Sequence, residues 1–332
     1  MLKLVFMGSD AIALPALNWL AGEGSAHATV VAIFTQPDRA VGRGQQVQPN
    51  AIKQWATARG LPVHQPDKFG ETDRLHLADY GADLALVMAY GHILRQEVIE
   101  TPRLGTVNLH ASLLPKLRGA SPIQTAIASG ERETGVAFMR IVRALDAGPV
   151  ADMERVPIAA LDTATEVEAK MADACVPLLR RALPRLAAGT LPFVEQAHAH
   201  ATFCRKLEKT DGTLDFAQPA NVLAARINGL MPWPSCAVEL DGLVVKLGLA
   251  TAQASATPAP AAPGTVLSGG REGLRIATGE GVLQLLRLQR PGGRLLPAEE
   301  FLRGLPIPVG KVIASRPMAT LVATAPFPRA KN

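Results

Sequence analysis

The sequence predicts an α/β fold with a doubly wound, mostly parallel sheet, followed by a small C-terminal β-barrel. The first observation is an apolar run over Leu2 to Met7, a glycine turn, a helical stretch over Ile12 to Ala21 and a second apolar run over Thr29 to Thr35. A strand, glycine turn, helix and strand in this order open a parallel doubly wound sheet. The second observation is that the last third of the chain contains short apolar runs separated by glycine turns, which is typical of a barrel.

Helices and strands continue to alternate up to about residue 190. The last helix starts at a threonine cap, with Glu166 at the capping-box position. The turn after the first strand has only one glycine, so the GxGxxG pattern is absent and dinucleotide binding loses its main support. We expect helices over Ala51–Arg59, Thr72–Tyr80, Pro122–Ser129 and Thr163–Ala187, a helix that ends near Glu100, and strands over Pro62–Gln65, Asp83–Ala89, Val107–Ala111 and Glu133–Ile141.

The last third of the chain predicts a barrel of the OB type, the commonest small barrel that binds nucleic acid. Its Ala/Pro segment, Thr251 to Pro263, cannot bury a core, so we expect a flexible loop there. The expected division is a first domain over 1–190, a connector over 191–210 and an OB-like domain over 211–332. The expected barrel strands are Ser235–Leu240, Leu243–Leu249, Gly264–Ser268, Leu274–Ala277 and Gly281–Leu288.

Composition describes a soluble globular protein. Apolar residues make up 48% of the 332 residues and charged residues 19%. The sequence contains no run of 18 uncharged apolar residues, so it predicts no membrane span. The N-terminus lacks the features of a signal peptide, so we expect a cytoplasmic protein. Cys175, Cys204 and Cys236 are scattered and odd in number, which argues against a disulfide framework or a zinc site and favours small core residues.

The basic charge is concentrated in the last third of the chain. Residues 205–332 carry 15 Lys and Arg against 9 Asp and Glu, whereas residues 1–204 carry 19 against 20. A basic module beside a neutral one indicates an anionic partner such as nucleic acid. The basic excess over residues 205–332 is by itself equally typical of surface charge that only keeps a protein soluble. A polar loop over Gln36 to Pro49 adds Arg39 and Arg43, which could contact phosphate or belong to a solvated surface loop.

The stretch from Gly105 to Gln124 carries the strongest indication of chemistry. If Val107 to Ala111 is a strand, its alternation places Asn108, His110 and Ser112 on one face. Buried polar groups are costly without partners, and a reaction centre would explain three of them on an apolar strand. A lone histidine is more often a satisfied core residue, but an adjacent amide can stabilise an oxyanion.

Asp146 supplies a carboxylate within a turn that ends at Gly148. Its side chain could orient or titrate His110, or it could cap its own backbone as a turn-former. The sequence does not place Asp146 beside His110.

The string Asn108-Leu-His110-Ala-Ser112-Leu-Leu-Pro115, with Arg118-Gly119 and Pro122-Ile123, resembles the signature of the folate-dependent formyltransferases. Leu145-Asp146-Ala-Gly148 is similar to the segment with that family's catalytic aspartate. The loop around Arg43 resembles that of members acting on methionyl-tRNA, as do Pro232-Trp233-Pro234 and residues 288–302. The resemblance runs from Leu4 to about Lys311. Gly8-Ser9-Asp10 and Leu295-Leu296 depart from the family pattern without touching the expected catalytic residues.

The resemblance implies a Rossmann-like formyltransferase domain and a defined reaction. A formyl group would pass from 10-formyltetrahydrofolate to the free α-amine of methionine on initiator tRNA, for translation initiation. Asn108 and His110 would hydrogen-bond the tetrahedral oxyanion, and Asp146 would polarise His110 and help to take a proton from the amine. The implied partners are initiator methionyl-tRNA and folate, without a metal or a membrane, and the protein is expected to be a monomer.

The resemblance also implies binding residues. Arg39, Arg43 and the basic barrel would contact the tRNA. Two other functions stay open: a related enzyme acting on a sugar amine or hydrolysing formyl-folate, and a non-catalytic RNA-binding protein. The expected folate-binding residues are Ser112, Leu113, Leu114 and Pro115 on one wall, and Tyr90, Gly91, Ile93 and Leu94 on another.

Overall fold

The computed structural model describes residues 1–41, 44–253 and 261–328. The chain forms two compact units. The N-terminal unit comprises Met1–Arg118, Gly135–Val156 and Glu168–Ala201, and the C-terminal unit comprises Gly119–Thr134, Pro157–Val167 and Thr202–Asn332. Each unit therefore draws on several separate parts of the chain, and the predicted boundaries near residues 190 and 210 stay predictions.

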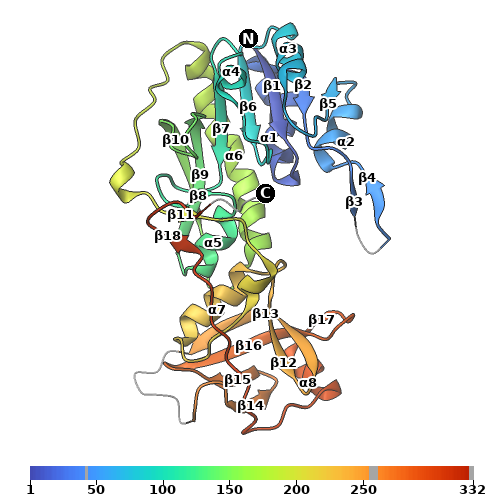
Figure 1. The fold of residues 1–332 in the computed structure, drawn as a ribbon, viewed down its shortest axis with the longest axis vertical. Coiled ribbons are helices and arrows are strands. Elements are labelled where there is room, and N and C mark those ends of the chain that lie inside the picture. The colour runs from blue at the N-terminus through green and yellow to red at the C-terminus, as the bar shows by residue number, and fades with distance from the viewer. Residues whose placement is uncertain (42–43, 254–260, 329–332) are drawn as a thin grey trace. The chain divides into compact units, whose positions relative to one another are not determined.

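A seven-stranded sheet of order β10-β9-β7-β6-β1-β2-β5 forms the N-terminal unit (Figure 1). Parallel pairs join β7, β6, β1, β2 and β5, whereas β9 runs antiparallel to β7. The predicted mostly parallel sheet is confirmed. Its strands are β1 (Leu2–Gly8), β2 (Ala28–Phe34), β5 (Val63–His64), β6 (Leu84–Met88), β7 (Thr106–His110), β9 (Glu133–Arg140) and β10 (Val150–Pro157).

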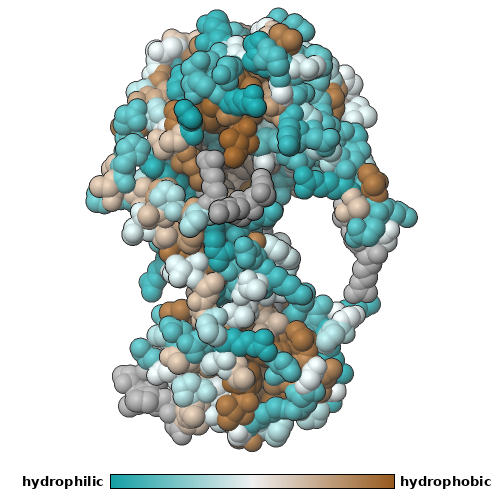
Figure 2. All heavy atoms as spheres, viewed as in Figure 1, coloured by the Kyte–Doolittle hydropathy of each residue, from teal (hydrophilic) through white to brown (hydrophobic). Residues whose placement is uncertain are grey.

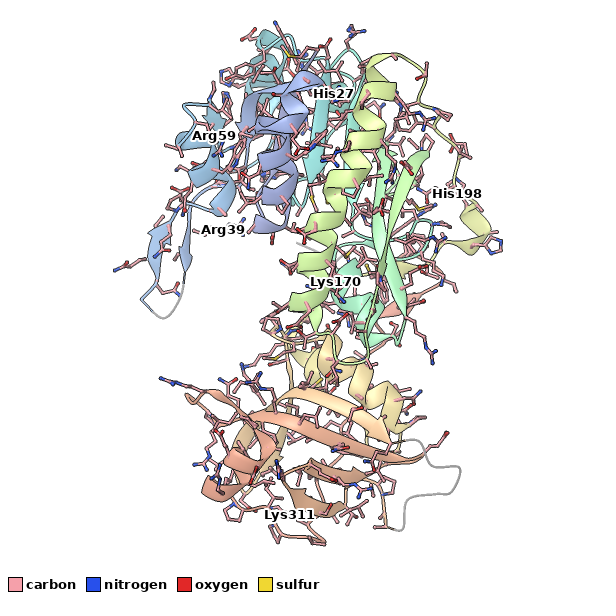
Figure 3. All side chains as sticks on the ribbon, turned by 180° about the vertical axis from the view of Figure 1, so that it is seen from behind. His27, Arg39, Arg59, Lys170, His198 and Lys311 are labelled. Atoms are coloured by element: carbon pink, nitrogen blue, oxygen red, sulfur yellow. The ribbon has the colours of Figure 1, made fainter. Side chains whose placement is uncertain are left out.

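Alternate side chains of the central strands fill the core on the two faces of this sheet. Val5 and Met7 pack in one cluster with Leu77 of α3. On the opposite face, Met88 meets Cys175 of α6, with the two sulfur atoms 3.9 Å apart. Figure 3 shows α6 lying along the sheet. The helices of this region are α1 (Leu14–Ala21), α2 (Ala51–Thr57), α3 (Glu71–Asp79), α4 (Gln96–Ile99) and α6 (Ala164–Ala187).

Helix α6 begins as the sequence predicts. The Glu166 carboxylate accepts a hydrogen bond from the backbone N–H of Thr163 at 2.9 Å, which confirms the capping box. The buried state of Cys175, Cys204 and Cys236 confirms that the cysteines are core residues. In the described parts of the chain, no helix combines the length and the apolar character needed to cross a membrane.

The C-terminal unit contains a barrel-like antiparallel sheet of order β12-β13-β16-β15-β14, with β17 paired to β16. This arrangement confirms the predicted second β domain. Side chains such as Phe216, Leu247 and Phe301 form its core. The strands are β12 (Cys236–Leu240), β13 (Leu243–Gln253), β14 (Val266–Gly270), β15 (Gly273–Ala277), β16 (Val282–Gln289) and β17 (Leu295–Pro297), and the helices are α5 (Pro122–Ala128), α7 (Ala220–Gly229) and α8 (Ala298–Gly304).

The C-terminal tail, for which the sequence made no prediction, is part of the fold. Strand β18 (Val322–Ala323) pairs antiparallel with β11 (Phe203–Cys204). The backbone N–H of Arg316 donates to the carbonyl oxygen of Leu214 at 2.8 Å. Gly119, in the short strand β8 (Arg118–Gly119), comes so close to β11 that a Cβ there would lie 1.9 Å from the carbonyl oxygen of Cys204. The tail therefore closes the edge of a small sheet.

Candidate active site

The predicted reaction centre lies at the carboxyl ends of neighbouring parallel strands. Ser9 follows β1, Tyr90 comes shortly after β6, and His110 ends β7. These strands are adjacent in the sheet order. Open α/β sheets bind ligands at this edge, beyond the carboxyl ends of the strands.

The imidazole of His110 is held between two partners. The ring is buried, with 5% of the residue exposed. Its Nε2 lies 3.1 Å from the carbonyl oxygen of Leu117, and its Nδ1 lies 3.7 Å from Oδ1 of Asp146. A carbonyl oxygen only accepts, so Nε2 carries a proton and donates it. Nδ1 is then the ring nitrogen that faces the Asp146 carboxylate.

Asn108 lies two residues before His110 on the same face of β7. Its backbone is fixed between β6 and β9, opposite Val87 and Met139. The side chain is half-buried, and its amide makes no side-chain hydrogen bond to the described residues. An amide N–H in this setting can donate to an oxygen that acquires negative charge.

Asp146 reaches His110 through a tight turn after β9. Its backbone adopts φ of 46°, a left-handed conformation that few non-glycine residues occupy. A Cβ on Gly148 would lie 2.0 Å from the carbonyl oxygen of Arg140, so only glycine fits there. The Gln196 side chain donates from Nε2 to the carbonyl oxygens of Asp146 and Gly148, at 2.8 and 2.7 Å. The structure thus places Asp146 beside His110, which the sequence could not show, and Asn108 on the same strand as His110.

The predicted one-face arrangement is wrong for Ser112. Strand β7 ends at His110, so Ser112 belongs to the following turn rather than to the strand. Its hydroxyl donates to the carbonyl oxygen of Lys116 at 2.6 Å and braces that turn. Leu114 is buried against Ala137, whereas Leu113 and Pro115 are half-buried. The turn therefore offers mainly Leu113 and Pro115 as surface.

The residues of the second predicted folate wall differ in how far they are buried. Tyr90 is 2% exposed and packs in the core, and among the described residues its hydroxyl has no hydrogen-bond partner. Burial raises the pKa of Tyr90 above its ordinary value. Gly91 is exposed, Leu94 is half-buried and Ile93 is 81% exposed. Only the residues after Tyr90 are therefore open to a ligand.

The predicted loop over Gln36 to Pro49 contains a hairpin, β3 (Arg39–Val41) and β4 (Gln46–Gln48). Arg39 is exposed at its base, as Figure 3 shows, and donates to the side-chain oxygen of Gln36 at 2.8 Å. Val47 on β4 is 69% exposed, and the surface around the hairpin is largely hydrophilic (Figure 2). Arg43 lies outside the described residues.

The base of the hairpin is tied to the sheet by Asp38. The Lys53 ammonium lies 2.6 Å from Oδ2 of Asp38, and Gln65 donates to Oδ1 at 2.8 Å. These two hydrogen bonds, Lys53 first, lower the pKa of Asp38 below its ordinary value. The hairpin therefore leaves the sheet from a fixed ionic anchor.

Sequence reasoning missed Gln196 and the residues that hold the hairpin base. Gln196 follows Asp146 by 50 residues in an irregular segment, and no local pattern marks it. No group of three His, Cys, Asp or Glu side chains within residues 1–41, 44–253 and 261–328 is arranged to hold a metal ion.

Comparison with known families supports the resemblance. The family model described as Formyl transferase matches residues 2–183, and the one described as Formyl transferase, C-terminal domain, matches residues 206–306. Methionyl-tRNA formyltransferase of Ectopseudomonas mendocina is 42% identical over 296 residues, which cover 89% of this chain and 92% of the relative. Methionyl-tRNA formyltransferase of Sinorhizobium medicae is 41% identical over 308 residues, which cover 92% of this chain and 97% of the relative.

Solved structures share the fold at low identity. A sugar 3N-formyl transferase crystallised with dTDP and 5-N-formyl-THF superimposes with a TM-score of 0.63 and 15% identity, covering 86% of this chain and 97% of its own. An N-formyltransferase from Helicobacter canadensis superimposes with a TM-score of 0.62 and 16% identity. The match covers 86% of this chain and 99% of the Helicobacter chain. At this identity the likeness describes the fold.

Proposed function

The chain belongs to the methionyl-tRNA formyltransferase family, and we therefore propose that it transfers a formyl group from 10-formyltetrahydrofolate to initiator methionyl-tRNA. The acceptor is the free α-amino group of the methionine, and the product is N-formylmethionyl-tRNA for translation initiation. The observation that carries this proposal is that His110 Nδ1 faces the Asp146 carboxylate at 3.7 Å, on the strand that also carries Asn108.

The proposed reaction needs a proton acceptor and a group that stabilises negative charge. The neutral amine attacks the formyl carbon, and the C=O oxygen becomes a tetrahedral oxyanion. Asn108 donates a hydrogen bond to that oxygen. The amine proton leaves toward Asp146 and Nδ1 of His110, which lie side by side. The bond from carbon to N10 then breaks, N10 takes up a proton, and tetrahydrofolate and the formylated amine are the products.

The donor is proposed to lie between the two loops at the carboxyl edge of the sheet. Leu113 and Pro115 on one loop, with Gly91, Ile93 and Leu94 on the other, expose the apolar surface that the folate ring requires. Ser112, Leu114 and Tyr90 would support these walls from behind, since each is buried. Folate is thus a co-substrate of the reaction rather than a resident group.

The acceptor is proposed to bind through the hairpin and the basic C-terminal region. Arg39 is exposed, and Arg43, which lies outside the described residues, is proposed to contact the tRNA as well. The excess of Lys and Arg over residues 205–332 suits the phosphates of the acceptor arm. The proposal keeps the division into 1–190, 191–210 and 211–332, and a monomer working in the cytoplasm, where charged tRNA and folate occur together.

A formylation assay tests the proposal. Purified protein is incubated with 10-formyltetrahydrofolate and either initiator or elongator methionyl-tRNA, and formylmethionine is quantified after deacylation. We expect rapid product formation with initiator tRNA and little with elongator tRNA. Formyl transfer to a dTDP-linked aminosugar without transfer to tRNA would contradict the proposal and support a sugar acceptor.

A further inference from the structure

Arg118 and Gln196 form a buried pair that the proposed reaction does not use. Arg118 is 5% exposed and Gln196 8%. Nε and Nη2 of Arg118 donate to the side-chain oxygen of Gln196, at 3.1 and 2.6 Å. A guanidinium only donates, so it fixes the amide oxygen of Gln196 toward itself and turns the NH2 group the other way.

The NH2 group of Gln196 points into the turn that carries Asp146. It donates to the carbonyl oxygens of Asp146 and Gly148, at 2.8 and 2.7 Å. Both of its N–H bonds are therefore in use. The turn contains the left-handed backbone of Asp146, a conformation that L-residues disfavour and that needs external support to persist.

The pair also joins the two segments that contact the imidazole of His110. Arg118 directly follows Leu117, whose carbonyl oxygen accepts the hydrogen bond from Nε2. Gln196 donates a hydrogen bond to the backbone of Asp146, whose carboxylate faces Nδ1 of His110. Nη2 of Arg118 further lies 2.9 Å from Nδ1 of His198, which Figure 3 labels and which belongs to the short helix η3 (His198–His200).

We propose that Gln196, oriented by Arg118, is a positioning residue that sets the direction of the Asp146 carboxylate relative to His110. This inference rests on the formyl transfer proposed above. Gln196 contacts only the backbone of the Asp146 turn. Without its two donors the turn loses two of the hydrogen bonds that hold its backbone, and the carboxylate moves. Because a displacement of about 1 Å can lower a rate by about 100-fold, we expect kcat to fall about 10- to 100-fold.

Two substitutions separate the orienting contact from overall stability. Gln196→Glu keeps the length of the side chain and its contact with Arg118, but places an oxygen against the two carbonyls. Gln196→Met removes both donors and the acceptor. Each should lower kcat while the KM values for folate and tRNA change less than threefold. Gln284→Met is the matched control, because Gln284 is also 8% exposed and donates to the backbone carbonyl of Glu272. The control should retain wild-type kcat.

A double-mutant cycle and hydrogen exchange test the mechanism of the effect. In an Asp146→Asn background, Gln196→Met should lower the residual kcat less than twofold, because the group that it positions is already gone. Amide exchange in peptides covering residues 144–148 should be faster in Gln196→Glu, with peptides covering β16 unchanged. The exchange measurement decides the question if the double variant is too slow to assay.

Three results would overturn the positioning role: a wild-type kcat in both variants, unchanged exchange over residues 144–148, or additive losses in the cycle. The wild-type protein in the same assay reports separately on the reaction. Absence of formylmethionyl-tRNA there would contradict the proposed function, whereas the exchange measurement would still test the support of the turn by Gln196.

Discussion

Nδ1 of His110, at the end of β7, lies 3.7 Å from Oδ1 of Asp146, in the turn after β9. The separation exceeds that of a direct hydrogen bond, so the two groups face one another across a short gap. Leu117 holds the opposite ring nitrogen at 3.1 Å and fixes the orientation of the imidazole. The pair therefore places an imidazole nitrogen and a carboxylate next to one another in a fixed orientation.

Replacement of either member of this pair should remove most of the activity. His110→Ala and Asp146→Asn are expected to lower kcat by about 10²- to 10⁴-fold, the usual contribution of acid–base catalysis. Asn108→Ala should lower it by about 10²- to 10³-fold through loss of an oxyanion donor. Steady-state formylation measures these effects. The control is His200→Ala, which removes an exposed histidine. Near-normal turnover in any of the three variants would remove that residue from the proposed reaction.

Loosening the base of the hairpin should weaken tRNA binding selectively. Lys53→Met removes the cation that anchors Asp38 at 2.6 Å. A partly exposed ion pair contributes little free energy, so the KM for methionyl-tRNA should rise by up to about fivefold. The KM for 10-formyltetrahydrofolate should stay constant. Lys68→Met, at an exposed lysine, is the control. An equal rise in both KM values would argue against a specific role of the hairpin.

Gly148→Ala should disturb the Asp146 turn by steric overlap. The added Cβ would lie 2.0 Å from the carbonyl oxygen of Arg140, and such overpacking costs about 1–3 kcal/mol. We expect a lower Tm in calorimetry together with a reduced kcat. Gly270→Ala is the matched control, because a Cβ there meets no atom within 4 Å. If Gly148→Ala kept wild-type Tm and kcat, the turn would be more adaptable than its geometry indicates.

Acid should weaken the C-terminal unit through Asp211, whose side chain is fully buried and paired with Arg205 at 2.6 Å. Burial favours the neutral carboxyl, but hydrogen bonds from Arg205 and the backbone N–H of Glu208 outweigh it and lower the pKa of Asp211. Its contribution to stability is therefore complete above the ordinary aspartate pKa, about 3.9, and disappears as pH falls through the lowered folded-state value.

Asp211→Ala should accordingly destabilise the protein by about 1.5–3 kcal/mol at pH 7, because it removes the charge-assisted hydrogen bonds that the buried carboxylate accepts from Arg205. Urea unfolding at several pH values measures this difference, which should shrink below about pH 4. Arg103→Met breaks the more exposed pair with Asp83 and should cost at most about 1 kcal/mol. A difference that stays constant down to the lowest pH would show that Asp211 titrates normally.

The sequence was sufficient for the parallel sheet and for two of the three catalytic candidates. Apolar runs such as β1 and β6 are buried on both faces and are unambiguous in the sequence. Asn108 and His110 followed from alternation within one strand. Asp146 was named as a carboxylate in a glycine turn, but the sequence could not place it beside His110, because that proximity depends on how the turn after β9 meets the end of β7.

The features that were not predicted depend on distant contacts. Ser112 was assigned to the strand because alternation alone gives no sign that β7 ends at His110. The β3–β4 hairpin is only three residues deep on each side and has no apolar periodicity. Gln196 acts through hydrogen bonds to backbone atoms, which leave no trace in the side-chain pattern of the turn.

The pairing of β18 with β11 has a consequence for biosynthesis. The two strands are separated by more than a hundred residues, and a ribosome makes the earlier strand first. During translation the edge of β11 that pairs with β18 therefore has no partner strand until the whole barrel-like sheet has been synthesised. An open edge of this kind invites pairing with other chains. Its short length, two residues, limits that risk until Val322 and Ala323 emerge and close it.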